Sequence, residues 1–165
     1  SLEIIIVNNG SIDSSEEDIN LRKNIFKDVK IIDIKKNIGF GNGIKEGIRN
    51  STCELICYTH GDLQFDLMNV FKAYSHYKSS SEKNKFVKGR RTKRSIIENF
   101  FTFFMSLINS ILFRKILYDI HAQPNLFEKN LIDNINFLPD DMSIDLYLLL
   151  KAKNNNFKRK KSSYY

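Results

Sequence analysis

The chain has 165 residues, with 26 lysines and arginines against 19 aspartates and glutamates, so its formal net charge is +7. With 42% hydrophobic and 12% aromatic residues it is long and apolar enough for one folded domain, which excludes disorder throughout. The charge is uneven, because residues 1–66 carry 8 basic and 11 acidic side chains and residues 67–165 carry 18 and 8. This asymmetry indicates an anionic partner, and nucleic acid, a membrane surface and a phosphorylated substrate all fit it.

Three short, isoleucine-rich segments predict buried parallel strands, at residues 3–7, 30–34 and 54–58. Helices are expected between and after these strands, at residues 14–26, 41–49 and 66–78. A fourth strand is expected at residues 85–89. This order predicts an α/β fold with a mostly parallel sheet and flanking helices. Cys53 and Cys57, beside and within the third strand, are expected to be buried thiols.

The second half continues with a long apolar segment, residues 95–117, which predicts one helix or two shorter ones. Polar residues interrupt any run long enough to cross a bilayer, so an amphipathic helix in the membrane interface and a core or dimer helix both fit. An extended piece is expected at 122–127 and a last helix at 143–153. The basic tail, 154–165, is expected to fray.

Loops at the carboxyl ends of parallel strands bind ligands in α/β folds, so the loops after the first three strands are candidate sites. The first loop offers hydrogen-bonding side chains and a glycine that permits close approach: Asn8, Asn9, Gly10, Ser11 and Asp13. Taken alone, an ordinary turn with a helix cap is its simpler interpretation. The second loop, NIGFGNG, has three glycines before a helix, with Asn37 and Gly39 as candidates for close approach to a ligand.

The third loop contains His60, Gly61, Asp62 and Gln64. Alternate side chains of an extended segment share one face, so the imidazole, the carboxylate and the amide would converge. Such a set suits a hard divalent cation, Mg²⁺ or Mn²⁺, whose other ligands are water and substrate phosphates. A solvated loop with a helix cap at Asp66 is the alternative.

In chain order, these loops resemble glycosyltransferase family 2, especially the polyprenyl-phosphate branch typified by dolichyl-phosphate mannose synthase. VNNGSID occupies the place of that family's DDGS-x-D motif, with asparagine at both leading positions, Asn8 and Asn9. The N-x-G element matches Asn37 and Gly39, and Gly47 matches a glycine of the helix that follows. The D-x-D-L-Q metal motif matches HGDLQ, with histidine in the place of the first aspartate.

The resemblance extends over nearly the whole chain. The family's G-x-R element resembles Gly89-Arg90-Arg91, with Arg94 close behind, and two later segments complete the match, DIHAQP and SIDL. Family members begin with a strand that precedes the first motif and run on beyond the last one, so a shortened or divergent member is expected. One domain is predicted over residues 1–153, with a nucleotide-sugar half at 1–66 and an acceptor half at 67–153.

The resemblance implies the GT-A fold and transfer of a sugar, with inversion, from a nucleotide diphosphate sugar to an acceptor. The residues that it implies for catalysis are Asp62, Arg91, Arg94, Asp119 and Asp145. Those for nucleotide-sugar binding are Asn8, Asn9, Gly10, Ser11, Asp13, Asn37, Gly39, Gly61 and Asp62. Those for acceptor binding are Arg90, Arg91, Arg94 and Gln123, and those for the metal are Asp62, Gln64 and His60.

A polyprenyl phosphate is the acceptor that the resemblance implies, and its ionised phosphate needs no strong general base. Arg91 and Arg94 would hold that phosphate, each charge-assisted hydrogen bond contributing roughly 1.5–3 kcal/mol. A sugar hydroxyl as acceptor would instead need a base, for which the candidates are Asp119, Asp141 and Asp145.

The expected location is the cytoplasm, at the inner face of the membrane, since residues 2–7 are too short an apolar run for a signal peptide. Two other functions stay open. Seven basic residues between 83 and 94 also suit a nucleic-acid-binding module, although no helix-turn-helix, zinc or base-stacking motif accompanies them. A catalytically inactive protein at the membrane surface is the other alternative.

Overall fold

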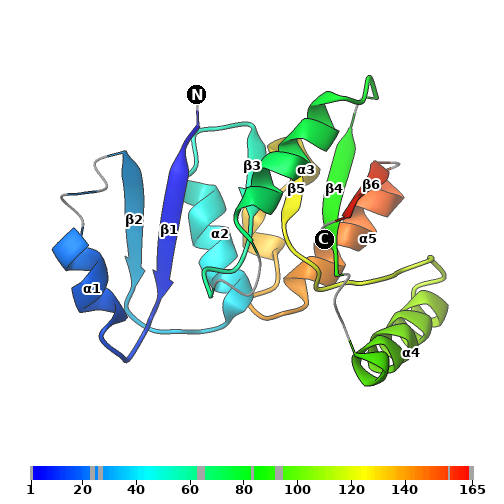
Figure 1. The fold of residues 1–165 in the computed structure, drawn as a ribbon, viewed down its shortest axis with the longest axis horizontal. Helices are drawn as coiled ribbons and strands as arrows, with labels where there is room; N and C mark the ends of the chain where they lie inside the picture. Colours follow the sequence, from blue (N-terminus) through cyan, green and yellow to red (C-terminus); the bar gives the residue numbers. More distant parts are fainter. Residues whose placement is uncertain are drawn as a thin grey trace. The chain divides into compact units, whose positions relative to one another are not determined.

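The computed structural model describes residues 2–22, 25, 28–62, 66–82, 84–91, 95–155 and 157–163 (Figure 1). The chain forms two compact units. Unit 1 comprises Ser1–Glu54 and Ile132–Tyr147, and unit 2 comprises Leu55–Leu131 and Leu148–Tyr165. The single domain expected over residues 1–153 stays a prediction.

Unit 1 is built on two parallel strands, β1 (Ile4–Asn9) and β2 (Val29–Ile34), at the first two predicted positions. The helix α1 (Ser15–Arg22) lies between them in sequence, and α2 (Phe40–Asn50) follows β2 and lies beside β1 in Figure 1. The approach of α2 to β1 is close, because a Cβ atom added at Gly47 would lie 3.4 Å from Val7 Cγ2.

Unit 2 contains a four-stranded sheet with the order β3-β5-β4-β6. Its strands are β3 (Leu55–Tyr58), β5 (Asn125–Glu128), β4 (Lys85–Arg90) and β6 (Lys158–Ser163). β5 is antiparallel to both β3 and β4, and β6 is parallel to β4. The expectation of a mostly parallel sheet is therefore wrong for unit 2, because the extended piece predicted at 122–127 forms a central strand whose Leu126 and Phe127 are buried.

Helices cover this sheet. Ala73 of α3 (Met68–Lys78) packs with Val87 and Leu126, which fixes α3 on one face. Figure 1 shows α3 in front of the sheet and the last helix, α5 (Ile144–Asn154), behind it. The tail does not fray as expected, because β6 pairs with β4 from Lys85↔Lys158 to Arg90↔Ser163.

The long apolar segment forms one helix, α4 (Ile96–Leu112), shorter than the predicted 95–117. It begins with a capping box: Ser95 Oγ accepts a hydrogen bond from Glu98 N at 3.2 Å, and the Glu98 carboxylate accepts one from Ser95 N at 2.8 Å. The S-x-x-E pattern at 95–98 is the sequence signal for this start. In the described part of the chain, no helix has the length and apolarity to cross a bilayer.

Candidate functional site

The carboxyl ends of β1 and β2 bring the first two candidate loops together. Asn8 stands opposite Asp33 in the parallel register, and its Nδ2 donates to Asp33 Oδ1 at 3.3 Å. Asn8 Oδ1 accepts from Ser11 N at 3.2 Å, and the residue is only 7% exposed. An aspartate at position 8 would place a second carboxylate against Asp33, so this contact explains the asparagine in physical terms.

We predict that Asn8→Asp destabilises the protein by about 1 kcal/mol at pH 7, through lost hydrogen bonding and repulsion from the exposed Asp33. Urea unfolding at pH 7 measures the loss. The compensating variant, Asn8→Asp with Asp33→Asn, restores the wild-type midpoint. Equal stability of the single and double variants would contradict the pairing.

Asn9 links the two loops more tightly. Its Nδ2 donates to Asn37 Oδ1 at 3.3 Å and to the Gly39 carbonyl at 3.0 Å. The first two candidate loops therefore meet at the ends of β1 and β2. Both partners accept hydrogen bonds, so the atom of the Asn9 amide that faces them is the nitrogen, and Oδ1 points the other way. Asn9 Oδ1 is buried and has no hydrogen-bond partner among the described residues, and a buried acceptor of this kind is suited to a donor on a ligand.

The remaining predicted residues of the first loop hold local structure. Gly10 has a φ of 69°, and a Cβ there would lie 2.9 Å from the Lys36 carbonyl carbon. Only glycine fits such a left-handed, crowded position. Asp13 Oδ1 accepts from Ser15 N at 3.0 Å at the start of α1, and hydrogen bonds from Ser15 lower the pKa of Asp13. Ligand binding by Gly10, Ser11 and Asp13 stays a prediction.

The glycine-rich loop is approached by the protein's own chain. Asn42 N donates to the Asp140 carbonyl at 2.9 Å, and the buried Lys45 forms an ion pair with the Asp140 carboxylate. A Cβ at Gly39, whose φ is 136°, would lie 2.9 Å from the Asp140 carbonyl carbon, and one at Gly41 would lie 2.8 Å from it. These two glycines therefore admit the 139–141 backbone, and nucleotide binding by Asn37 and Gly39 stays a prediction.

The predicted metal residues follow β3 in unit 2. His60 is half-buried, Gly61 and Asp62 are exposed, and Gln64 lies outside the described residues. Within the described ranges, no group of three or more His, Cys, Asp or Glu side chains is placed to hold a metal ion. An exposed carboxylate with an imidazole two residues before it suits a cation whose remaining ligands are water and phosphate oxygens.

The predicted acceptor residues lie where β4 ends. Arg91 N donates to Asp119 Oδ2 at 2.8 Å, and the Arg91 guanidinium donates to the His121 carbonyl at 2.5 Å. Gln123 is 1% exposed and its Oε1 accepts from Asn125 Nδ2 at 3.1 Å. The structure thus joins Arg91 to the segment that contains Asp119 and Gln123.

Three further predicted residues differ in accessibility. Arg90 is exposed at the end of β4, whereas Asp145, in unit 1, is 0% exposed within α5. Arg94 lies outside the described residues. Asp141, the third candidate base, is exposed, and its Oδ1 accepts from Ser143 N and Oγ, which lowers the pKa of Asp141.

Two of the described lysines in the basic run between residues 83 and 94 are buried. Lys85 and Lys88 are 6% and 0% exposed. Lys85 Nζ donates to the carbonyl of Tyr77, in the last turn of α3, at 2.6 Å and to that of Ser80, after the helix, at 2.9 Å. It also lies 4.0 Å from the centre of the Tyr77 ring. These ammonium groups bind backbone carbonyls inside the protein, which removes two of the cations that favoured a nucleic-acid-binding module. Sequence reasoning missed this burial, although the lysines stand within a strand, KFVKGR.

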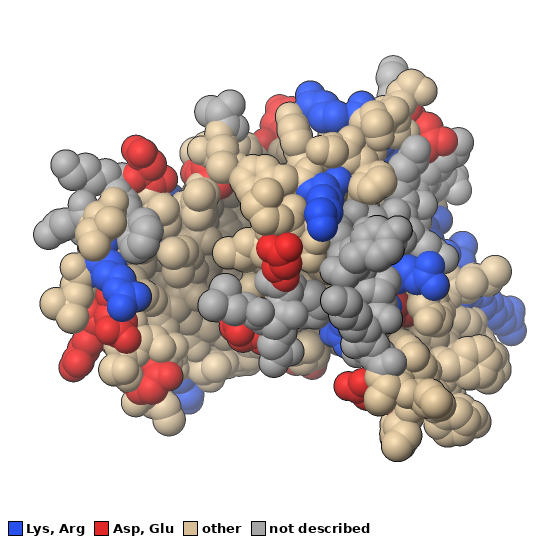
Figure 2. All heavy atoms as spheres, in the orientation of Figure 1, with Lys and Arg blue, Asp and Glu red and all other residues tan. Residues whose placement is uncertain are grey.

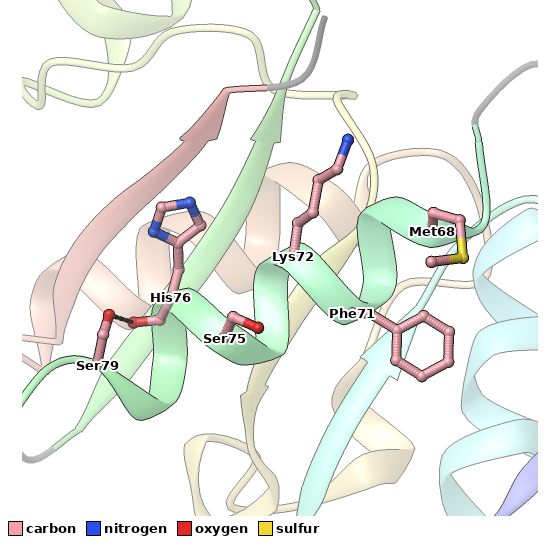
Figure 3. A pocket seen from close by; sticks show the side chains of 6 residues that line it. All are labelled: Met68, Phe71, Lys72, Ser75, His76 and Ser79. Carbon is pink, nitrogen blue, oxygen red and sulfur yellow. Dashed lines mark hydrogen bonds between the residues drawn. The ribbon is translucent and has the colours of Figure 1, made fainter.

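A shallow pocket of about 420 Å³ lies along the outer side of α3 (Figure 3). Its lining residues are Met68, Phe71, Lys72, Ser75, His76 and Ser79. Five of them belong to α3 and Ser79 is the C-cap that follows it, and all six are exposed to solvent. None of the predicted site residues lines this pocket.

An extended apolar surface in unit 2 belongs to α4, where eleven of the seventeen residues are exposed large hydrophobics. At 100° per residue they span an arc of about 200°. The opposite arc contains Ser106, which is 4% exposed, and Ser110, whose hydroxyl accepts from Leu117 N at 2.8 Å. The polar side of α4 therefore faces the protein and the apolar side faces outward, the reverse of a helix on a soluble core. In Figure 2 the α4 region, at lower right, is mostly uncharged.

Solved structures with a similar fold include glucosyl-3-phosphoglycerate synthase from Mycobacterium tuberculosis bound to uridine diphosphate, with a TM-score of 0.66 and 12% identity over 98% of this chain and 59% of that chain. A mycobacterial protein matches with a TM-score of 0.70 and 13% identity, over 98% and 55% of the two chains. The same synthase bound to Mn²⁺, uridine diphosphate and glucosyl-3-phosphoglycerate gives a TM-score of 0.64 at 12% identity, over 98% and 59%.

The chain thus spans less than two thirds of the length of these structures, and at these identities the likeness shows an α/β fold similar to theirs. No curated protein matches the sequence. The family model described as "Glycosyl transferase family 2" matches residues 1–122, which is more than half of the chain. The chain therefore belongs to glycosyl transferase family 2.

Proposed function

We propose that this protein transfers a sugar, with inversion, from a nucleotide diphosphate sugar to a polyprenyl phosphate at the cytoplasmic face of a membrane. Family membership supports the sugar transfer, and the outward apolar arc of α4 carries the choice of a lipid-linked acceptor. Because Arg91 N donates to Asp119 Oδ2, the chain leaves and returns at one point on either side of α4. Arg90 and Arg91 therefore lie only a few residues before α4, the helix proposed to bind the membrane.

Donor-binding roles are proposed separately for a loop of each unit: contact with the nucleotide base for the first loop of unit 1, and metal binding for the β3 loop of unit 2. The buried acceptor Asn9 Oδ1 would take a hydrogen bond from an N–H group of the nucleotide base. Asp62, with His60 and Gln64, would hold a divalent cation. Such a cation, when bound, offsets negative charge on the departing nucleoside diphosphate. The Mn²⁺ and uridine diphosphate in one similar synthase structure support this choice of cofactor and donor.

Acceptor binding is proposed for the end of β4. Arg90 is exposed and Arg91 is half-buried, and a guanidinium group suits a phosphate because it donates several hydrogen bonds. Asp119 and Gln123 are both buried, in the segment that Arg91 contacts, and they would orient the acceptor end of the site. An ionised phosphate oxygen attacks without a general base, which agrees with the burial of Asp119 and Asp145.

Calorimetry with UDP-sugars and GDP-sugars in the presence of Mn²⁺ tests the donor. Binding of one of these donors, lost on chelation of the metal, is the expected result. Absence of heat for every donor, with folding verified by circular dichroism, would refute the transferase. Transfer to a water-soluble sugar but not to a polyprenyl phosphate would refute the lipid acceptor alone.

We predict that Phe101→Asp, on the apolar arc of α4, weakens binding to anionic vesicles about tenfold, because a 65% exposed phenyl ring no longer enters the lipid. Co-sedimentation measures this. The matched control is Asn99→Asp, which introduces the same charge on the polar arc of the helix. Equal vesicle binding by the two variants would show that the apolar arc does not bind lipid.

A further inference from the structure

Lys88 is the one charged residue in β4 that is 0% exposed, among the described residues. Its strand neighbours Phe86 and Val87 are also 0% exposed and apolar. Burial of an ammonium group in such surroundings is unfavourable unless hydrogen bonds replace its lost water. A neutral side chain would fill the same space at a lower desolvation cost. The hydrogen bonds that Lys88 makes therefore account for a lysine at this position.

Lys88 binds the segment between α4 and β5. Its Nζ donates to the Ala122 carbonyl at 3.0 Å and to Asn125 Oδ1 at 2.7 Å. The amide of Asn125 is thereby oriented, and its Nδ2 donates to Gln123 Oε1 at 3.1 Å. One ammonium group therefore fixes the backbone at Ala122 directly and the Gln123 side chain through Asn125.

The residues after Lys88 bind the same segment. Gly89 N donates to the Pro124 carbonyl at 2.9 Å, and Arg91 N donates to Asp119 Oδ2 at 2.8 Å. Residues 119–124 contain no helix or strand, so their buried carbonyls need donors from elsewhere. The end of β4 supplies donors from three positions, and Lys88 is the innermost of them.

We propose that Lys88 is a positioning residue that fixes the 119–125 segment, and with it Asp119 and Gln123, for acceptor binding. Lys88 itself does not touch the acceptor. The identity of the acceptor rests on the function proposed above, whereas the positioning of the segment does not. A lysine suits this role because one ammonium group donates to several acceptors at a single point.

Two variants test the proposal. Lys88→Met keeps the length of the side chain and removes all its donors, so it is expected to lower thermal stability. Lys88→Met combined with Asn125→Leu removes the charge and its main side-chain partner together, and such apolar replacement of a buried polar pair restores stability. The double variant therefore separates stability from positioning.

Two measurements are made on both variants. Hydrogen exchange of the Gly89 and Arg91 amides reports on the contacts to the segment, with the β1 amides of unit 1 as reference. Steady-state transfer to a polyprenyl phosphate gives KM for the acceptor and, separately, for the donor. We expect the double variant to melt at the wild-type temperature, to exchange these two amides at least tenfold faster, and to keep an acceptor KM raised about tenfold with an unchanged donor KM.

A merely structural role predicts that exchange and acceptor KM both return to wild-type values with the melting temperature, and that result would overturn the proposal. If the wild-type protein transfers no sugar to a polyprenyl phosphate, the proposed function fails and the exchange measurement decides alone. In that case, wild-type exchange at Gly89 and Arg91 in the double variant overturns the positioning role, and faster exchange supports it.

Discussion

Asp62→Ala is expected to weaken metal-dependent donor binding by at least about 100-fold, equivalent to roughly 2.7 kcal/mol. Asp62 is the carboxylate of the β3 loop, and the described neighbours do not offer a cluster of three metal-binding side chains that would replace it. Because Asp62 is exposed, its removal leaves no buried cavity, and thermal stability is expected to stay within about 0.5 kcal/mol of wild type. Calorimetry with Mn²⁺ and a nucleotide diphosphate sugar measures the loss.

Two further variants sharpen this test. Asp62→Asn keeps the shape of the side chain and removes its charge, so it should lose nearly as much affinity as the alanine variant. His60→Asp restores a second carboxylate next to the cation and should raise Mg²⁺ affinity about tenfold, since the affinity of such sites rises with the number of charged ligands. Full donor binding by Asp62→Ala would place the metal site elsewhere.

The local elements were predictable because each depends on nearby residues. Isoleucine-rich runs predicted β1 and β2 at their observed positions, and parallel strands that end at one edge bring Asn9 to the second loop. The arrangement of unit 2 was not predictable in the same way. β5 lies between β3 and β4 because it pairs with both strands. The composition of a short apolar segment does not indicate which strands it pairs with.

Contacts between distant segments explain the other differences. The glycines at 39 and 41 were interpreted as room for a ligand, but the chain at 139–141 occupies that room. The lysines at 85 and 88 contribute to the basic run that suits nucleic acid, yet both bind backbone carbonyls inside the protein. In each case the residue type indicates a close backbone approach or a hydrogen-bond donor. It does not identify the partner, which is a backbone group elsewhere in the sequence.

Gly89→Ala is expected to destabilise the protein by about 3 kcal/mol or more, a large part of the stability of a small domain. A Cβ atom at Gly89 would overlap the Gln123 carbonyl group and lie 3.0 Å from Pro124 N. Both sides of this contact are held. Gly89 is paired with Ser162 of β6, and the Pro124 carbonyl accepts from Gly89 N. Lys88 holds the backbone nearby, so relief of the overlap must break one of these bonds.

Gly61→Ala is the matched control for this steric argument. Gly61 is exposed, its φ lies outside the left-handed region, and no heavy atom would lie within 4 Å of an added Cβ. Its substitution should leave the urea midpoint unchanged or raise it slightly, because alanine restricts the unfolded chain. Urea unfolding of both variants distinguishes the crowded glycine from the open one. If the two midpoints agree, the backbone of residues 119–125 is not fixed against β4, and the acceptor end of the site lacks the rigidity on which the role of Lys88 depends.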